Sequence, residues 1–334
     1  MGWFRLFANC TIRGMLNKKG GFAVKYMAGL KNGDQNLLEC ICQNKAHIHE
    51  VYFSWGDFPN GRSSQLLSDR YAPWELQDMQ RQALRRLSDE GVRLNLLFNA
   101  NCYGADSQSR AFFHKIGTTM DYVAQHYGLH SVTTTSPLIA KFVHQNFEGI
   151  EVRASVNMEI GTVQGMDYLA EYFDSYYMKR ELNRDLQAID HLHKWAKENG
   201  KELFMLANSG CLNHCSAHNF HDNLVAHEAE IAKMDNAYAF GGICREYLKD
   251  PSHFKSLIED TNFIRPEDMH RYEPYFTAAK LATRIHPNPT TVVNSYIRGK
   301  FSGNILDILE PRHSIYPYVI ENGDPLRLIK LEEN

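Results

Sequence analysis

The sequence predicts an α/β protein with the fold class of a TIM-like (β/α)8 barrel carrying a C-terminal extension. Eight short apolar or β-branched segments recur along the chain, and segments with a helical period separate most of them. The length of 334 residues also suits one such barrel with added segments. A doubly wound open sheet is the competing arrangement, because it is built from the same alternation of strands and helices.

The predicted strands are of ordinary length, and turn signals bound most of them. They cover residues 22–29, 50–55, 92–99, 131–136, 151–157, 175–180, 202–207 and 278–284. One predicted helix follows Pro73, which suits a first helical turn, and ends near Gly91. Another has Asn183 as its N-cap and Gly200 as its stop.

The chain divides into a barrel and a tail. We expect the barrel to span residues 1–298, with an inserted region rich in cysteine and histidine at 208–250. Residues 299–334 contain several prolines and are expected to pack on the barrel as an extension. The sequence contains no internal repeat or low-complexity tract that would indicate another architecture.

Composition excludes several classes of protein. A net charge of −3 and a pI near 6.6 provide no global basic field, so DNA is not an expected partner. No segment has the roughly twenty apolar residues that span a bilayer, so no membrane association is expected. Seven scattered cysteines do not form the framework of a small secreted domain. The sequence therefore favours a cytoplasmic location.

Polar residues collect where the predicted strands end. Asn99 ends the third strand, Asn157 the fifth and Arg284 the eighth, while Arg180 and Glu181 close the sixth. In a barrel these ends converge on one mouth, where the chemistry is built. Polar residues also occur at strand ends simply because the ends meet solvent. Since adjacent strand residues point to opposite faces, only one of Arg180 and Glu181 should face the interior.

A dense group of possible metal ligands follows the strand at 202–207. Cys211 and Cys215 come directly after its turn. Histidines stand nearby at positions 214, 218, 221 and 227. Thiolates four residues apart can face one centre, and thiol and imidazole ligands suit zinc or an iron–sulfur cluster. The alternative is a histidine-rich helix whose cysteines only fill space in the core.

The order of several motifs resembles a known family. The series runs through Val51-Tyr52-Phe53, the turn Gly61-Arg62-Ser63, Asn99, the Ser-x-Asn of 155–157, the Arg-Glu-Leu of 180–182 and the Cys211–Cys215 turn. The late segment FIRPEDMHRYEPYFTAAKLATR, residues 263–284, adds to the likeness. This pattern resembles the collagenase-like peptidases, family U32, over about residues 51–284. The family's Cys-rich block appears here only as NSGCLNHC, which indicates a divergent member.

The resemblance implies two different activities. The family name implies a peptidase, whereas an iron–sulfur branch acts in oxygen-independent hydroxylation of a small molecule or of RNA. In that branch four cysteines hold a [4Fe–4S] cluster near the barrel mouth. Carried over, the ligands are Cys211, Cys215 and Cys244, with Cys40 as the fourth and Cys102 as its rival. Burial in the first helix is the alternative for Cys40, and packing after a flexible loop is the alternative for Cys244.

Zinc is the principal alternative to the cluster. Cys211, Cys215 and Cys244 with either His218 or His221 would form a closed tetrahedral site of nitrogen and sulfur ligands. Such a site could be purely structural, and the chain would then be a metal-binding or partner-binding scaffold without catalysis.

Catalytic and substrate-binding residues are predicted from both the strand ends and the resemblance. Arg180, Glu181 and Asn157 are the catalytic candidates. The substrate-binding candidates are Arg62, Asn99, Arg265 and Arg284, and the arginines suit anionic groups. The expected substrate is a small molecule or RNA, with a protein partner as a further option.

Proteolysis has weaker support in the residues themselves. The sequence contains neither a G-x-S-x-G elbow nor an H-E-x-x-H helix. Cys211 with His214 could form a thiolate–imidazole pair, but the sequence indicates no oxyanion hole or orienting group.

Overall fold

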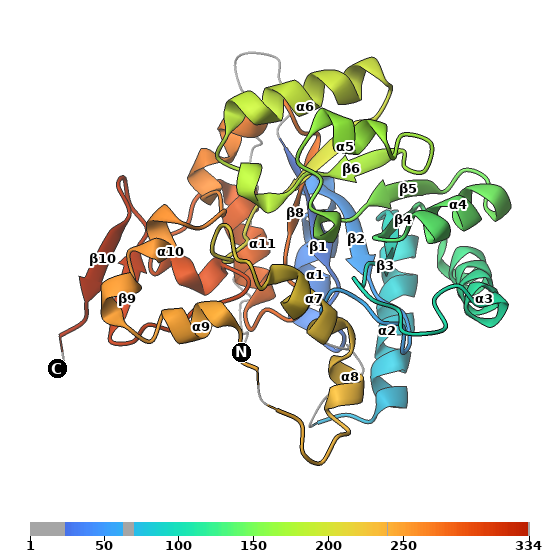
Figure 1. Cartoon of the computed structure of the whole chain (residues 1–334), viewed down its shortest axis with the longest axis horizontal. Coiled ribbons are helices and arrows are strands. Elements are labelled where there is room, and N and C mark those ends of the chain that lie inside the picture. Colours follow the sequence, from blue (N-terminus) through green and yellow to red (C-terminus); the bar gives the residue numbers. More distant parts are fainter. Residues whose placement is uncertain (1–23, 63–69, 239, 333–334) are drawn as a thin grey trace, which may run out of the picture.

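The computed structural model describes residues 24–62, 70–238 and 240–332. It contains a closed barrel of eight parallel strands in the order β1 to β8, in which β1 pairs with both β2 and β8 (Figure 1). The strands are β1 (Lys25–Gly29), β2 (Ile48–Phe53), β3 (Leu94–Phe98), β4 (Ser131–Thr134), β5 (Glu151–Ala154), β6 (Ser175–Tyr177), β7 (Glu202–Leu206) and β8 (Ala278–Leu281). Closure confirms the predicted barrel and excludes the open sheet. Each predicted strand overlaps an observed one, although Phe22 and Ala23 of the first predicted strand lie outside the described residues. Ser63 of the predicted Gly61-Arg62-Ser63 turn also lies outside them.

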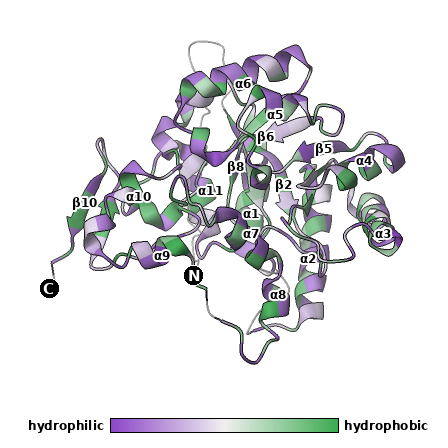
Figure 2. Ribbon diagram, in the orientation of Figure 1, coloured by the Kyte–Doolittle hydropathy of each residue, from purple (hydrophilic) through white to green (hydrophobic). Residues whose placement is uncertain are grey.

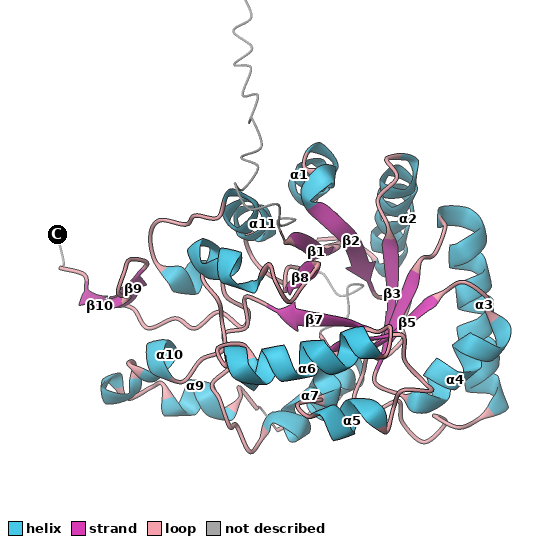
Figure 3. Ribbon diagram, turned by 90° about the horizontal axis from the view of Figure 1, so that it is seen from above, coloured by secondary structure: helices cyan, strands magenta, loops and turns pink. Residues whose placement is uncertain are grey.

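Helices connect the strands and lie outside them (Figure 3). They are α1 (Gln35–Gln43), α2 (Pro73–Asp89), α3 (Arg110–Tyr127), α4 (Pro137–Asn146), α5 (Val163–Asp167), α6 (Leu186–Glu198) and α11 (Pro289–Arg298). Each carries both apolar and polar residues (Figure 2), and the apolar residues pack on the barrel wall. In the described ranges no helix has both the length and the apolar run that a bilayer crossing requires.

The two predicted helices form, but one cap differs. Pro73 opens α2, as expected, and the Glu75 carboxylate accepts a hydrogen bond from the Ala72 amide at 2.7 Å. The N-cap of α6 is Asp185, whose carboxylate accepts from two backbone amides, and not Asn183. Asn183 is instead buried and donates to the carbonyls of Leu206 and Asn262, both at 2.8 Å. It therefore ties the end of β7 to a distant loop.

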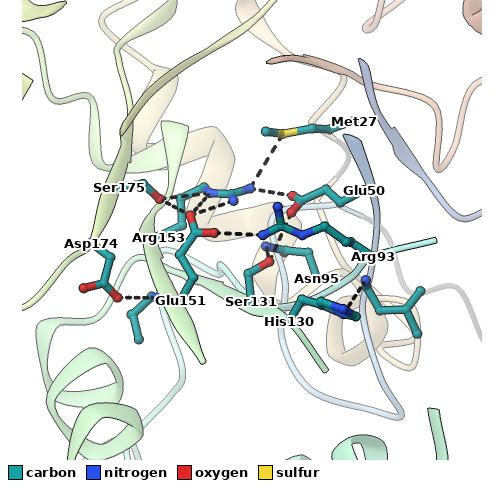
Figure 4. Close-up of polar contacts among 12 residues, drawn as sticks. Met27, Glu50, Arg93, Asn95, His130, Ser131, Glu151, Arg153, Asp174 and Ser175 are labelled. Carbon is teal, nitrogen blue, oxygen red and sulfur yellow. Dashed lines mark hydrogen bonds and ion pairs between the residues drawn. The ribbon is translucent and has the colours of Figure 1, made fainter. Parts of the chain in front are cut away.

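The lower part of the barrel interior is a polar network (Figure 4). Glu50 and Arg153 are both fully buried, and their carboxylate and guanidinium groups lie 2.5 Å apart. Glu151 also contacts Arg153 at 2.7 Å, and the Ser131 hydroxyl donates to Glu50 at 3.1 Å. Burial alone would lower the pKa of Arg153, but Glu50 foremost raises it well above its usual value. This part of the barrel is filled and its charges are paired.

The connection between β7 and β8 is much longer than the others. It holds the helices α7 (His218–Ala226), α8 (Glu228–Ile231), α9 (Ile243–Tyr247) and α10 (Ser256–Glu259), and the 3₁₀ segments 251–253 and 266–272. Cys211, Cys215 and Cys244 all belong to this connection. The most extended loop of the barrel thus supplies the cysteines at its mouth.

The C-terminal extension contributes to the mouth as well as to the outer surface. The Glu310 amide donates to the Asn208 carbonyl at 2.9 Å, and the Gly210 amide donates to the Glu310 carbonyl at 3.0 Å. A Cβ at Gly210 would clash with the carbonyl oxygen of Pro311, so the close approach requires glycine. Farther along, β9 (Tyr318–Glu321) and β10 (Arg327–Lys330) form a hairpin beside the barrel (Figure 1).

Candidate functional site

The carboxyl ends of the strands surround a narrow space that we call the mouth pocket. It encloses about 410 Å³, part of it open to solvent. Its lining consists of Tyr52, Gly61, Arg62, Asn99, Val156, Asn157, Leu206, Lys280, Ala282, Thr283, Arg284, Ile285 and Glu310. The pocket therefore gathers residues from β2, β7 and β8, from the segments after β3 and β5, and from the C-terminal extension.

Two predicted residues, Asn99 and Asn157, lie together in the mouth pocket. The side-chain amide of Asn157 donates to the Asn99 carbonyl at 3.2 Å, and the Asn99 side-chain oxygen accepts from the Gly61 amide at 3.2 Å. A Cβ at Gly61 would lie 2.5 Å from the Asn157 amide nitrogen. Gly61 thus allows the turn that carries Arg62 to approach both asparagines.

Two of the predicted arginines also line the mouth pocket. Arg284 donates to the side-chain oxygen of Asn60 at 2.9 Å, and burial lowers the pKa of Arg284 to about 10, so the guanidinium stays charged at neutral pH. Arg62 faces the Glu310 carboxylate at 4.0 Å. Burial raises the pKa of Glu310, against the opposing effect of Arg62. The mouth thus concentrates positive charge, which suits an anionic group.

Lys280 is the third basic residue that lines the mouth pocket, and no carboxylate of the described residues forms an ion pair with it. Its side chain is 6% exposed and lies over the rings of Tyr52 and Tyr177, with Nζ 4.2 and 5.0 Å from the ring centroids. Burial, and then Arg284 and Arg62, lower the pKa of Lys280 well below its usual value. The sequence reasoning missed this residue. A lysine within the otherwise apolar strand segment AAKLA was the signal that could have found it.

Glu310 and Tyr52 are two further residues of the mouth that the sequence reasoning missed. Glu310 comes from the extension, more than a hundred residues after Asn208, and nothing in the local sequence indicates its place. Tyr52 was read only as part of the second strand. Its hydroxyl donates to the Leu281 carbonyl at 2.7 Å, which fixes the ring beneath Lys280.

A second space lies beside the first, and we call it the cysteine pocket. It encloses about 550 Å³, part of it open to solvent. Its lining consists of Glu159, Lys179, Arg180, Glu181, Cys211, Leu212, Cys215, His218, His221, Cys244, Asn262 and Pro311. The structure thus brings together three of the four predicted cluster cysteines, both alternative histidines, and the predicted catalytic pair Arg180 and Glu181.

Arg180 occupies the centre of a chain of polar contacts in the cysteine pocket. Its guanidinium lies 3.8 Å from Cys211 Sγ and also contacts the His218 ring. His218 Nδ1 lies 2.6 Å from the Glu159 carboxylate, and Nε2 lies 3.4 Å from that of Asp222. Burial and then Arg180 lower the pKa of His218, while the carboxylates oppose the shift. His218 is therefore an oriented imidazole that is largely neutral at pH 7.

The neighbouring residue Glu181 has a different role from Arg180. It does not continue β6, because β6 ends at Tyr177 and residues 180–182 form a 3₁₀ turn. The expected strand alternation between Arg180 and Glu181 is therefore wrong. The Glu181 carboxylate pairs with Lys179 at 2.5 Å and accepts from the His214 amide at 2.9 Å. It holds the Cys211–Cys215 loop against the barrel.

Cys244 reaches the cysteine pocket from the far end of the long connection. A Cβ built on Gly242 would lie 3.7 Å from Cys244 Sγ and 3.6 Å from His221 Cε1, so this thiol and imidazole flank the same glycine. Burial, followed by the charges of Cys211 and Cys215, raises the pKa of Cys244. The three sulfurs are therefore close enough to interact electrostatically.

The donor chemistry of the cysteine pocket fits a metal centre, and its present geometry is open. Three thiols and an adjacent imidazole are the soft and intermediate ligands that iron–sulfur clusters and zinc use. Across the described ranges, no three histidine, cysteine, aspartate or glutamate side chains stand in the arrangement of metal ligands. The structure thus gathers possible donors in one pocket and, within those ranges, shows no assembled coordination sphere.

Cys40 is not the fourth member of the set, and this prediction is wrong. It lies on α1, outside the barrel, with its sulfur 3.5 Å from the Asn294 side-chain oxygen of α11. The helix alternative holds, because α1 buries an apolar face on which Cys40 is a packing residue. Cys102 lines a separate pocket with Asn157, and hydrogen bonding to His227 lowers the pKa of Cys102.

Arg265 lines neither the mouth pocket nor the cysteine pocket. Its guanidinium pairs with Asp268 at 2.6 Å and contacts the Gly323 carbonyl in the terminal hairpin. It therefore joins the 266–272 turn to the C-terminal extension.

Comparison with other proteins agrees with this architecture. No protein-family model matches the chain. An uncharacterized protease of Methanocaldococcus jannaschii, MJ1657, is 26% identical over 289 residues, which cover 83% of this chain and 80% of that protein. The solved structure of the U32 peptidase Mk0906 superposes with a TM-score of 0.55 at 14% identity, covering 80% of this chain and 95% of the other.

Both pockets stand at the carboxyl ends of the barrel strands, which is where (β/α)8 enzymes carry their active sites. The fold class is therefore that of the (β/α)8 barrels. Within that class the chain is similar to proteins of the collagenase-like peptidase family, U32, in line with the resemblance that the order of its motifs predicted.

Proposed function

We propose that the chain is an iron–sulfur enzyme of this family and that the cysteine pocket holds a [4Fe–4S] cluster. The observation that carries the proposal is the gathering of Cys211, Cys215 and Cys244 around one pocket, although the third comes from a separate part of the long connection. Thiolates favour iron–sulfur clusters and zinc over harder ions. With Cys40 excluded, His221, which flanks Gly242 together with Cys244, is the candidate for the fourth position.

The proposed reaction is an oxygen-independent hydroxylation, or a related modification, of a small molecule or RNA. A bound cluster would supply electrons or a Lewis-acidic iron. The chain itself would provide positive charge at Arg180 and a proton acceptor at the His218 ring, oriented by Glu159 and Asp222. The mouth pocket beside it would hold an anionic part of the substrate through Arg62 and Arg284. A cytoplasmic location, where thiols stay reduced, belongs to this proposal.

A peptidase is the second candidate, because the two similar proteins described above are named as a protease and a peptidase. The cysteine pocket contains a thiol, Cys211, and an imidazole, His218, that two carboxylates orient. These are the parts of a cysteine nucleophile and its base. In this geometry Arg180 contacts both the sulfur and the ring, so proton transfer would first require Arg180 to move.

Quantifying iron and acid-labile sulfide after anaerobic purification tests the proposal. We expect about four of each per chain in the wild type, and a loss of both in Cys211→Ala and in Cys244→Ala. Cys40→Ala is the matched control, because this buried cysteine lies on α1, outside the barrel. The iron and sulfide content of this variant should equal that of the wild type.

Other results would assign the site differently. Zinc without sulfide would indicate a closed structural site and a scaffold role. Absence of metal together with cleavage of denatured collagen that Cys211→Ala abolishes would establish the peptidase. Either result contradicts the iron–sulfur proposal.

A further inference from the structure

Lys280 is buried inside the barrel, and lysine is rarely buried without an ion-pair partner. On β8 it pairs in register with Met27 of β1 and Leu206 of β7. Its neighbours Ala278 and Ala282 belong to the interior cluster with Tyr52 and others, and side chains alternate along a strand. Lys280 therefore points to the barrel axis and forms part of the floor of the mouth pocket.

The surroundings of the Lys280 amine are aromatic rings and arginines, whereas a buried amine usually has a carboxylate beside it. Throughout residues 24–62, 70–238 and 240–332, no acceptor forms a hydrogen bond or ion pair with its Nζ, whose contacts are the faces of Tyr52 and Tyr177. The buried acid on its side, Glu50, is already paired with Arg153 at 2.5 Å and bonded by Ser131.

The charged groups around Lys280 explain the state of its amine. Toward the mouth stand Arg62 and Arg284, and toward the base of the barrel stand Arg153 and Glu50. Burial, then Arg284 and Arg62, lower the pKa of Lys280, and Glu50 opposes this only in part. The lowered pKa increases the fraction of the Lys280 amine that is uncharged, and the uncharged amine has the free electron pair of a nucleophile.

The rest of the mouth pocket is complementary to a particular kind of molecule. Arg62 and Arg284 offer guanidinium groups to a carboxylate or phosphate, and the Asn99 and Asn157 amides lie on the same wall. The space is narrow, so the molecule, or the part of it that enters, must be small. A nucleophilic amine beneath two anion-binding groups matches a carbonyl carbon next to an acidic group.

We propose that the mouth pocket binds a small anionic carbonyl compound, such as a 2-oxo acid, and that Lys280 Nζ forms a Schiff base with it. The nitrogen electron pair forms a bond to the carbonyl carbon, and the carbonyl oxygen takes up a proton to give a carbinolamine. In sum the two amine protons pass to this oxygen, one as the carbinolamine forms and one as the C–O bond breaks, so one molecule of water leaves while the C=N bond forms. No electron donor or acceptor is required.

This assignment goes beyond the proposed function and does not depend on it. Lys280 and the cysteines line different pockets, and the Schiff base would form with or without metal bound near Cys211. The two pockets adjoin, since the consecutive residues Glu310 and Pro311 each line one of them. A substrate held covalently at Lys280 would therefore lie next to the cysteine pocket.

Reductive trapping on the full-length wild-type protein tests the assignment. The protein is incubated at pH 7 with pyruvate and cyanoborohydride, and the modified lysines are quantified by peptide mass mapping. Lys249, whose side chain is 71% exposed, is the internal reference. An exposed lysine is uncharged in only about one part in a thousand or less at pH 7, so we expect Lys280 to be modified at least about tenfold faster.

The neutral ketone butanone, matched in size, is the second probe. We expect the ratio of Lys280 to Lys249 modification to fall at least about fivefold with butanone, because it lacks the carboxylate that the guanidinium groups attract. Arg62→Gln should reduce the pyruvate ratio more than the butanone ratio, because Arg62 attracts only the carboxylate probe, whereas its effect on the pKa of Lys280 is shared by both probes. The Schiff base is overturned if Lys280 stays unmodified while Lys249 reacts. Equal ratios for the two probes would overturn the anionic class of ligand. Both outcomes are independent of iron content.

Discussion

Two cationic side chains lie inside the same barrel, and their surroundings differ in kind. Arg153 has Glu50 and Glu151 within ion-pair distance, and the network around it is closed (Figure 4). Lys280 has aromatic rings below it and two arginines toward the mouth. The pKa of Arg153 is raised and that of Lys280 is lowered, although burial opposes the charge of both. The carboxylates beside Arg153, and the burial and neighbouring arginines of Lys280, therefore account for the opposite pKa shifts of the two side chains.

The largest expected effect comes from opening the paired end of the barrel. Glu50→Gln leaves Arg153 buried without its main counter-ion, and we expect a loss of about 3–5 kcal/mol in the free energy of unfolding. Urea denaturation at pH 7 measures it. Glu39→Gln breaks an exposed pair with Arg86 and should change stability little. Equal effects from the two variants would show that the Glu50–Arg153 pair is not structural.

Replacing Lys280 should instead increase the free energy of unfolding. Lys280→Met removes a buried amine whose pKa burial lowers, and we expect a gain of about 1–3 kcal/mol at pH 7, because a buried polar group without a hydrogen-bond partner is destabilising. The unfolded lysine binds a proton below its usual pKa of 10.5, while the folded lysine, with its lowered pKa, does not. Lowering the pH from 10.5 toward the folded pKa therefore destabilises the wild type relative to the variant.

The pH dependence of this gain provides its own check. Denaturation of wild type and Lys280→Met at pH 7 and at pH 10 should show a smaller difference at the higher pH. A difference that grows with pH would mean that Lys280 is charged and paired in the folded protein.

A smaller effect should follow from narrowing the mouth. Gly61→Ala places a methyl group 2.5 Å from the Asn157 amide nitrogen, so we expect a loss of about 1–3 kcal/mol from overpacking. Gly117→Ala in α3, where the nearest atom lies 3.4 Å away, should instead gain up to about 1 kcal/mol. Thermal denaturation of both variants compares them, and a neutral Gly61→Ala would show that the mouth yields easily.

The smallest expected effect extends the comparison to the cysteine pocket. After burial, Arg180 is the main cause of the lowered pKa of His218, while Asp222 and Glu159 oppose it. Arg180→Met should therefore raise the pKa of His218, measured by NMR titration of its ring proton. Arg184→Met is the control, because Arg184 contacts the carbonyls of Ile258 and Phe263 and not His218. An unchanged pKa would remove Arg180 from the contact chain.

Local patterns in the sequence determined the eight strands, the start of α2 and the convergence of Asn99, Asn157 and Arg284 on one mouth. These follow from apolar runs, turn residues and the rule that parallel strands end together. They also determined that Cys211 and Cys215 follow a strand end, because both come directly after the apolar segment 202–207 and its turn.

Only the tertiary structure decided which distant groups share a pocket. Cys40 faces α11 and not the mouth because α1 covers the outside of the barrel, and Arg265 is drawn to the terminal hairpin by Asp268 and Gly323. Glu310 enters the mouth by pairing with residues near Asn208, and Lys280 faces Tyr52 only because β8 closes the ring on β1. Side-chain charge depends on neighbours hundreds of residues away, which no local pattern encodes.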